Sequence, residues 1–420
     1  MIINHLFPRY TEFDPKVPVW CVTPKGGGLH RFFDTSPVSP SGRYLAVLRM
    51  PDQPRLNLPG ETAEIVVIDL HTAEETVVAD TRGWEPQLGA NLNWGADDAS
   101  LYYNDVDTAS WEPFVTRLNP LTGEKRRYEG SIYRTSPDGR WILCANAAAM
   151  RRTQFGYGVV LPDELVPRNF GFRADDGLYI TDTESGNRRL LVSLAEVMEK
   201  AQPLIDRDAY RHGELYGFHC KFNPQGDRLL FTMRWFHSEE AEPWNQISKR
   251  LAFWVVTLKP DGSELHVAVG PEQWVKGGHH INWFPDGEHL SMNLALDGDR
   301  KLKLVRVKYD GTGLGKITDA VPGSGHPTVH PDGRHILTDS YEKEPVAYGD
   351  GTVPLRWIDL ATETEQTLVR IRVAHEGAKA NNALRVDPHP AWAPDFRHIV
   401  FNGYVDGDRR VFIADLGSVL

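Results

Sequence analysis

The stretch SPDGRWILCANA, residues 136–147, places a tight-turn sequence directly before a run of strand-like residues. Proline presets one backbone angle of a turn, and aspartate and glycine tolerate the others, so the stretch predicts a turn followed by a β-strand. The same arrangement returns along the chain and gives seven copies in all. The seven turns occupy residues 39–42, 95–98, 136–139, 223–226, 284–287, 330–333 and 393–396.

Most copies continue with two further strand-like runs, as TAEIVVIDL and ETVVAD follow the first turn. Repeated four-stranded units predict an all-β fold, a seven-bladed β-propeller. The last unit has only three such runs, and VWCVT at residues 19–23 is expected to add the fourth strand and close the ring. The expected blades, in a single domain over 1–420, cover about 33–80, 89–129, 131–192, 217–269, 278–318, 324–370, and 387–416 with 18–23.

Composition narrows the class of protein. Hydrophobic residues make up 41% and charged residues 25% of the chain, as in soluble globular proteins, and no apolar run is long enough to span a membrane. The net charge of −11 argues against a nucleic-acid partner. Three scattered cysteines without CxxC spacing predict neither a disulfide framework nor a cysteine zinc site. The first residues do not resemble a signal peptide, so a cytoplasmic location is expected.

One position of the repeat carries histidine in four consecutive units. The first strand of each propeller blade lines the central channel, so equivalent positions form a ring, and four imidazoles are expected to converge from one side of it. This position, which we call the histidine column, lies seven residues before the last residue of each turn. It is occupied by Thr35, Asn91, Ile132, His219, His280, His326 and His389.

Neutral imidazole is a common metal ligand and a general base near neutral pH, and three histidines with open positions are typical of a catalytic metal site. The alternative is a channel in which the histidines only hold water. Two positions after the column, Arg134 and Lys221 are expected to point into the same channel, because alternate strand residues face the same way. The pair His30 and Arg31 is expected in a loop at the channel mouth, where it would bind a substrate.

Other histidines are expected outside this cluster. His279 has the opposite strand parity from its neighbour in the column, and His330, His335 and His398 lie at or after turns, where surface positions are expected. A short helix is predicted over residues 193–201, where a serine N-cap precedes an early glutamate.

At these residues the chain resembles the oligogalacturonate lyases, which are seven-bladed propellers of pectin breakdown, and the wider group of TolB-like propeller lyases. The sequence HINWFPDG at residues 280–287 is similar to that family's metal-histidine strand, His-x-Phe-Trp-x-Pro-Asp-Gly. The segment DPHP at residues 387–390 resembles its His-Pro-His-Pro, and the His30 and Arg31 pair resembles one that precedes its first blade.

The resemblance implies a metal bound by His280, His326 and His389, with His219 as the Brønsted base. It favours manganese, with calcium or zinc as alternatives. Two positions depart from the family pattern. Gly323 stands where the family has a glutamine ligand, and Asp387 replaces the first histidine of His-Pro-His-Pro, so that water or this aspartate would have to fill the gap.

The implied activity is cleavage of an acidic, uronate-containing oligosaccharide by β-elimination. A metal would neutralise the uronate carboxylate, Arg134 or Lys221 would assist as charge clamps, and His219 would remove the C5 proton. Residues 19–46 are also similar to propellers that act on rhamnosyl-glucuronate linkages. A lyase or histidine-based hydrolase for those linkages, or a non-catalytic scaffold, therefore remain alternatives.

Overall fold

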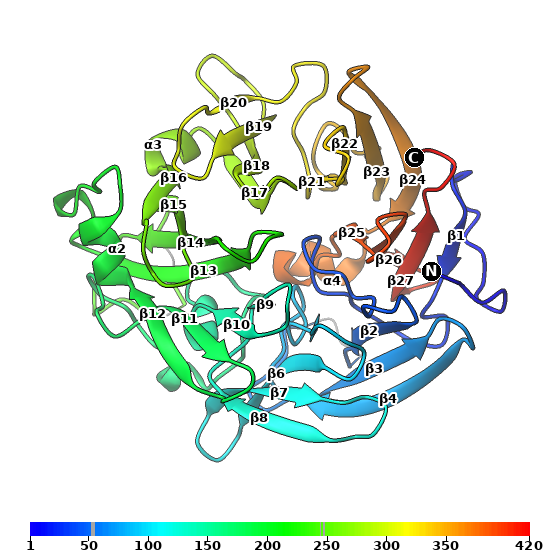
Figure 1. Ribbon diagram of the computed structural model, residues 1–420, viewed down its shortest axis with the longest axis horizontal. Helices are drawn as coiled ribbons and strands as arrows, with labels where there is room; N and C mark the ends of the chain where they lie inside the picture. Colours follow the sequence, from blue (N-terminus) through cyan, green and yellow to red (C-terminus); the bar gives the residue numbers. More distant parts are fainter. Residues whose placement is uncertain (52–54, 244, 247) are drawn as a thin grey trace.

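Seven antiparallel sheets form a closed ring in the computed structural model, which describes residues 1–51, 55–243, 245–246 and 248–420 (Figure 1). The predicted all-β, seven-bladed propeller is therefore confirmed. The first blade contains β2 (Tyr44–Arg49), β3 (Ala63–Asp69) and β4 (Glu74–Thr81). The second contains β5 (Asn93–Trp94), β6 (Leu101–Asp107), β7 (Glu112–Leu118) and β8 (Lys125–Glu129). The third contains β9 (Arg134–Thr135), β10 (Trp141–Cys144), β11 (Gly177–Asp182) and β12 (Arg188–Ser193).

The remaining blades repeat this order, with the strand that carries or directly follows the histidine column at the inner edge. The fourth contains β13 (Glu214–Phe222), β14 (Leu229–Phe236), β15 (Leu251–Leu258) and β16 (His266–Val269). The fifth contains β17 (Gly278–Trp283), β18 (His289–Leu294), β19 (Lys303–Lys308) and β20 (Gly315–Lys316). The sixth contains β21 (Thr328–Val329), β22 (His335–Thr338), β23 (Thr352–Asp359) and β24 (Thr364–Arg372).

The last blade joins the two ends of the chain. It contains β25 (Ala391–Trp392), β26 (His398–Val405), β27 (Asp408–Asp415) and β1 (Val19–Cys21). The strand β1 pairs antiparallel with β27, with Val19 opposite Ala414 (Figure 1). The predicted closure of the ring by an N-terminal strand is confirmed.

The first blade departs from the regular pattern at the channel. Its inner position holds two isolated bridges, Leu29 to Leu48 and Val38 to Leu45, instead of a fourth named strand. Between these bridges, residues 30–37 leave the sheet. This segment positions much of the site described below.

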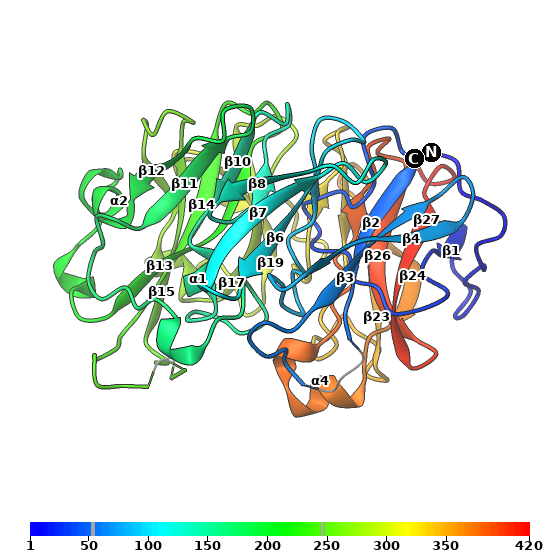
Figure 2. The same cartoon turned by 90° about the horizontal axis from the view of Figure 1, so that it is seen from below.

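Helices are few and short: α1 (Ala147–Met150), α2 (Leu194–Lys200), α3 (Pro271–Trp274), α4 (Glu376–Ala380) and the 3-10 turns η1 (Asp163–Leu165), η2 (Asp208–Tyr210) and η3 (Asn382–Leu384). The predicted serine-capped helix is α2, where Ser193 and Glu196 form a reciprocal capping box. Figure 2 shows α4 protruding from one face of the ring. In the part of the chain that the structure describes, no helix is long and apolar enough to cross a lipid bilayer.

The turns explain why aspartate and histidine recur in the repeat. In the sixth blade, Asp332 accepts the backbone N–H groups of Arg334 and His335, and its second oxygen lies 2.6 Å from Nδ1 of His335. His398 contacts Asp395 in the same way at 2.7 Å. Both imidazoles are buried, so the expectation that they are surface residues is wrong. The cause is that the turn carboxylate binds the ring and Trp357 stacks on His335.

Candidate metal-binding site

The inner strands are irregular where they carry the histidine column. The pairing of β17 with β18 shifts register between His279 and Asn282, and His280 has a φ of 59°. His389 has a φ of 48°, in the left-handed region that side chains rarely adopt. A β-bulge of this kind inserts a residue and re-aims the side chain next to it. His280 therefore owes its direction to a local bulge as well as to strand alternation.

The bulge also changes the place of His279. Its ring centroid lies 4.5 Å from that of His280, and the two Nδ1 atoms are 2.8 Å apart. The expectation that strand parity keeps His279 out of the cluster is wrong, because the register shift brings two consecutive side chains to the same side. Burial lowers the pKa of this imidazole to about 3.

One aromatic ring contacts all four column histidines. Phe32, from the segment that leaves the first blade, is 1% exposed. Its ring stacks on His219 at a centroid distance of 5.2 Å. The other three histidines meet its ring at centroid distances of 4.7 to 6.1 Å; they are His280, His326 and His389. The structure thus brings together the four imidazoles that the repeat predicts.

Asp339 orients two of these histidines. Its Oδ1 atom accepts the backbone N–H of His326 at 2.8 Å and lies 2.8 Å from Nδ1 of the same ring, while Oδ2 accepts the backbone N–H of His389 at 3.1 Å. A carboxylate on Nδ1 holds the proton there and leaves a lone pair on Nε2. Nε2 of His326 is buried and has no hydrogen-bond partner among the described residues, and the same holds for both ring nitrogens of His389.

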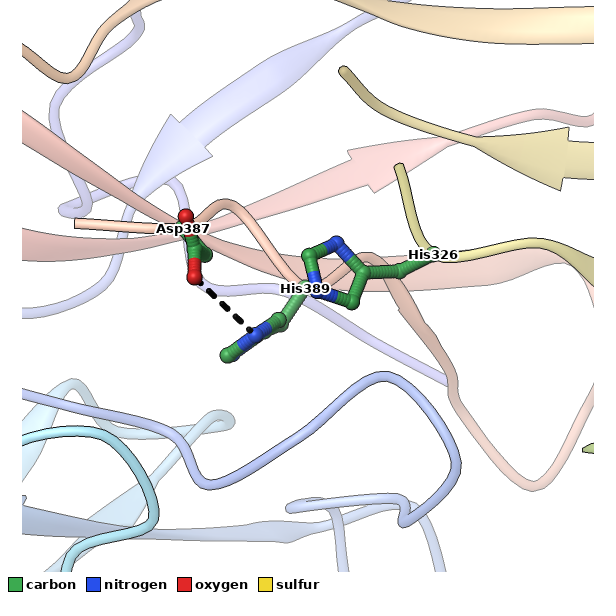
Figure 3. Close-up of side chains that lie close together, drawn as sticks. All are labelled: His326, Asp387 and His389. Atoms are coloured by element: carbon green, nitrogen blue, oxygen red, sulfur yellow. Dashed lines mark ion pairs between the residues drawn. The ribbon is translucent and has the colours of Figure 1, made fainter. Parts of the chain in front are cut away.

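Three side chains offer ligand atoms at metal-binding spacing. His326, Asp387 and His389 each place one such atom within 4.8 Å of the others, and all three are buried (Figure 3). Oδ2 of Asp387 lies 3.7 Å from Nε2 of His389. The unpartnered imidazole nitrogens and the carboxylate fit a divalent cation, because a buried lone pair without a donor is costly unless something binds it. Asp387 is positioned to fill the gap that the sequence departures left open.

His280 lies beside this group with its tautomer fixed. Its Nδ1 is 2.7 Å from the carbonyl oxygen of Gly325, which keeps the proton on that nitrogen, and its ring centroid is 3.8 Å from that of His326. Nε2 lies 3.1 Å from the hydroxyl of Tyr341. Burial and the carboxylate of Asp387 raise the pKa of Tyr341 well above its ordinary value, so this hydroxyl stays protonated.

His219 stands apart from the three ligand side chains. Its Nδ1 makes a short hydrogen bond with the hydroxyl of Tyr133, and its ring is partly exposed. Burial, together with the nearby cations of Arg234 and Lys221, holds the pKa of His219 well below its ordinary value. The ring is therefore neutral at physiological pH, as a proton acceptor must be.

The two predicted channel cations, Arg134 and Lys221, meet around a carboxylate that the sequence did not single out. Nζ of Lys221 lies 2.7 Å from Oδ2 of Asp34, and Nη1 of Arg134 lies 3.9 Å from Oδ1. Burial alone would raise the pKa of Asp34, but Lys221, Arg31 and Arg134 hold it well below its usual range. The cations thus share the channel interior, as the strand register predicts, but they face Asp34 and not the histidines.

His30 and Arg31 do not lie in an open loop. Both are buried, because the segment that carries them turns into the channel from the edge of the first blade. Arg31 donates to Oδ1 of Asn91 at 2.9 Å and packs over the ring of Tyr133. Nε2 of His30 lies 3.4 Å from the carbonyl of Pro388, and burial lowers its pKa to about 4. The expectation of a channel-mouth loop is wrong for this pair.

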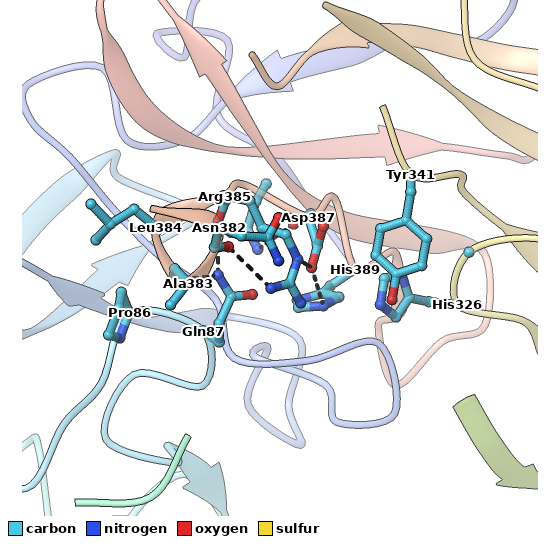
Figure 4. Close-up of polar contacts among 12 residues, drawn as sticks. Pro86, Gln87, His326, Tyr341, Asn382, Ala383, Leu384, Arg385, Asp387 and His389 are labelled. Carbon is cyan, nitrogen blue, oxygen red and sulfur yellow. Dashed lines mark hydrogen bonds and ion pairs between the residues drawn. The ribbon is translucent and has the colours of Figure 1, made fainter. Parts of the chain in front are cut away.

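One further cation lies against the ligand group. Nε of Arg385 is 2.8 Å from Oδ2 of Asp387, and its guanidinium also donates to the hydroxyl of Tyr157 at 3.2 Å. The side-chain amide of Gln87 donates to the carbonyls of Ala383 and Arg385, which anchors this segment (Figure 4). Sequence reasoning missed Arg385, since it lies in a connection between blades and outside the repeated strands.

Asp339, by contrast, carried a signal in the repeat. It lies six residues after the last turn position, where the seven units have Leu48, Asn104, Ala145, Thr232, Asn293, Asp339 and Asn402. Five of these side chains are polar, and all five are buried. They bind backbone at the inner strands, as Asn104 does with Ile132 and Asn402 with His30. Recognition of this column of polar residues, in addition to the histidine column, would have singled out Asp339.

Comparison with known proteins gives similarity in structure only. No family model matches the chain, and no curated protein matches it. An oligogalacturonate lyase in complex with manganese superposes with a TM-score of 0.64 at 16% identity, over 99% of this chain and 97% of the other. An oligogalacturonate lyase from Vibrio parahaemolyticus also has a TM-score of 0.64, at 14% identity and the same coverage. The resemblance to oligogalacturonate lyases is thereby confirmed at the level of the fold.

Proposed function

We propose that the chain is a metal-dependent lyase that cleaves uronate-containing oligosaccharides by β-elimination. The observation that carries this proposal is the group of His326, Asp387 and His389. Nε2 of His326 and both ring nitrogens of His389 are buried without a partner among the described residues, while a neutral His219 faces the same phenylalanine ring. A similar fold that occurs in complex with manganese favours that metal, with calcium and zinc as alternatives.

The cation would be held by His326, His389 and Asp387. His280 lies beside them, and its Nε2 would become a fourth ligand by exchanging the hydroxyl of Tyr341 for the cation, which would also free that hydroxyl. When bound, a divalent cation supplies Lewis-acid neutralisation of the uronate carboxylate. Arg385 contacts Asp387 of this group directly, at 2.8 Å, so we assign the charge clamp to it in place of Arg134 and Lys221.

His219 would remove the proton from C5 of the uronate. Base action requires the tautomer in which Nδ1–H donates to the hydroxyl oxygen of Tyr133, because Nε2 then carries the lone pair. The electron pair of the broken C5–H bond forms the C4–C5 double bond, and the C4–O bond breaks. The leaving oxygen takes a proton, for which the protonated hydroxyl of Tyr341 is the donor we assign.

The test has two measurements. Metal analysis of the purified chain after dialysis against manganese should find about one ion per chain, and His389→Ala should abolish it. Incubation with oligogalacturonides and, separately, with rhamnosyl-glucuronides should raise the absorbance of an unsaturated uronate with one of them. Saturated products would contradict the lyase proposal and support a histidine-based hydrolase. Absence of product from both substrates would contradict an enzymatic role and support a non-catalytic scaffold.

The acidic oligosaccharide is the partner of this proposed site, and the proposed compartment is the cytoplasm. The cytoplasmic proposal is supported by the three cysteines Cys21, Cys144 and Cys220, which are all free, as expected in a reducing environment.

A further inference from the structure

A cavity of about 510 Å³ lies at the turn end of the channel. We propose that it is a separate binding site for a small carboxylated sugar, a sugar acid of monosaccharide size. It is lined by residues that follow the histidine column by two or three positions, among them Asn93, Trp94, Arg134, Trp283 and Trp392. This inference does not use the elimination activity, and it would stand if that activity were absent.

The segment that leaves the first blade separates this cavity from the histidines. Phe33 lines the cavity, and its ring lies 5.2 Å from that of His326 and 4.7 Å from Nζ of Lys221. None of the four column histidines is among the described residues that line the cavity. Phe33 therefore forms a partition, so that a ligand in the cavity does not reach the metal-binding group.

The charges at this partition do not balance. Among the described residues, Asp34 is the one carboxylate that pairs with Lys221, Arg31 and Arg134, which leaves two positive charges in excess. The side chains of Asp34 and Lys221 are 2% and 4% exposed, but that of Arg134 is 27% exposed and lines the cavity. Buried cations in excess favour an anion as ligand.

The guanidinium of Arg134 has capacity for that anion. Its polar contacts with described residues, to Thr35 and Asp34, both use Nη1. Nε and Nη2 thus keep the planar pair of donors that binds a carboxylate in two parallel hydrogen bonds.

The rest of the lining suits a hydroxylated ring. Trp94, Trp283 and Trp392 supply aromatic faces, and the exposed Phe396 stands at the rim. Four polar atoms of the lining are buried without a hydrogen-bond partner among the described residues: Asn93 Oδ1, Trp283 Nε1, Thr328 Oγ1 and Trp392 Nε1. Such a mixture of donors and acceptors matches hydroxyl groups, which both donate and accept. The volume lies in the usual range for small-molecule pockets.

The experiment is calorimetric titration of the full chain, treated with a chelator, with D-glucuronate and D-galacturonate, and with glucose and acetate as comparators. We expect at least one uronate to bind more tightly than either comparator, because only the uronates offer both the charge and the ring. Arg134→Gln should weaken uronate binding about tenfold or more, as loss of a charge-assisted pair does. Phe396→Ala, at a 44% exposed position where folding is not at risk, should weaken it roughly fivefold.

The matched control is His389→Ala, which alters the metal-binding group and leaves this cavity intact, so its uronate affinity should equal that of the wild type. Absence of uronate binding to the wild type would overturn the proposal, as would glucose or acetate binding equally tightly. Uronate binding that survives Arg134→Gln and disappears in His389→Ala would place the ligand at the histidines and overturn it too. Because the readout is binding to metal-free protein, failure here is distinct from failure of the lyase proposal.

Discussion

Oδ1 of Asp339 contacts His326 twice, at the backbone N–H and at Nδ1 of the ring, both at 2.8 Å. Through this double contact, one buried carboxylate fixes the position of the strand and the tautomer of the imidazole together. Carboxylate partners of this kind are what orient histidine ligands in metal sites and raise their basicity. The candidate ligand His326 is thus oriented by a residue that is not itself in the group of candidate ligands.

Replacement of Asp339 should therefore weaken metal binding without removing a ligand. We expect Asp339→Asn to lower manganese affinity about 10- to 100-fold, because the amide is uncharged and its nitrogen cannot accept the N–H of His389. Competition with a fluorescent chelator measures this affinity. An affinity equal to that of the wild type would show that Asp339 only holds the strands together.

His219 and His389 should separate proton transfer from metal binding. His219→Ala is expected to keep the metal and to lower kcat about 10²- to 10⁴-fold, which is the usual contribution of a general base. His389→Ala should lose the metal and the activity together. Metal content and kcat measured on the same preparations distinguish the two, and loss of metal in His219→Ala would contradict the assignment of the base.

Phe32 should be a strong determinant of stability, since its ring contacts all four column histidines and is 1% exposed. Phe32→Ala is expected to cost about 3–5 kcal/mol, as is typical for truncation of a buried phenylalanine. Phe13→Ala, at a 40% exposed position, is the matched control and should change stability by about 0.5 kcal/mol or less. Urea denaturation followed by fluorescence gives both values, and equal midpoints for the two variants would refute the central role of Phe32.

Glu85 should make stability fall as pH rises. Its carboxyl is fully buried, accepts the N–H of Gly156 at 2.8 Å and lies 3.4 Å from Nε of Arg151. Burial outweighs these contacts and raises the pKa to about 8. Because the pKa of Glu85 is higher in the folded chain than in the unfolded chain, its contribution to stability is complete at pH values below the unfolded-state pKa. This contribution is lost as pH rises through the folded-state pKa of about 8. The total loss is on the order of 5 kcal/mol.

Glu85→Gln should flatten this part of the pH profile, because the amide does not ionise. Thermal denaturation at intervals from pH 4.5 to pH 9 provides the comparison, with the exposed Glu124→Gln as the control. If the wild type and Glu85→Gln lose stability in parallel over this range, another group is responsible.

The metal should also stabilise the fold. A cation that binds only the folded chain adds about 2.7 kcal/mol at a concentration 100 times its dissociation constant. We therefore expect manganese to raise the melting temperature of the wild type and to leave that of His389→Ala unchanged. A rise of the same size in both proteins would place the bound ion elsewhere.

The sequence was sufficient for the architecture because turns and strand alternation are local signals. The Pro-Asp-Gly turns predicted seven blades, and the three runs of the last unit predicted the closing strand. The side chains that face the channel were harder to predict, because the alternation of polar and apolar residues does not reveal a β-bulge. His279 was placed outside the cluster for that reason, and the register shift in β17 brings it inside.

The first blade shows the same limit. The pattern of residues 33–37 predicts the inner strand of an ordinary unit, with His30 and Arg31 in a loop before it. In the structure, residues 30–37 leave the sheet between two bridges, and nothing in their pattern indicates it. As a consequence, the sequence did not single out Asp34, which is the carboxylate that pairs with Arg134 and Lys221. Asp339 was within reach of sequence reasoning, since its polar column is as regular as the histidine column.

The pairing of β1 with β27 sets the order in which the protein can assemble on the ribosome. Val19 and its partner Ala414 lie 395 positions apart in the sequence, so the first must wait for the second to be synthesised. At 5–20 residues per second, the first strand waits roughly 20–80 s with an unpaired edge. The ring of Phe32 shares this delay, because it packs against His389, which lies 357 positions later in the sequence. A nascent chain therefore cannot bring Phe32 into contact with all four column histidines until the last blade has been synthesised.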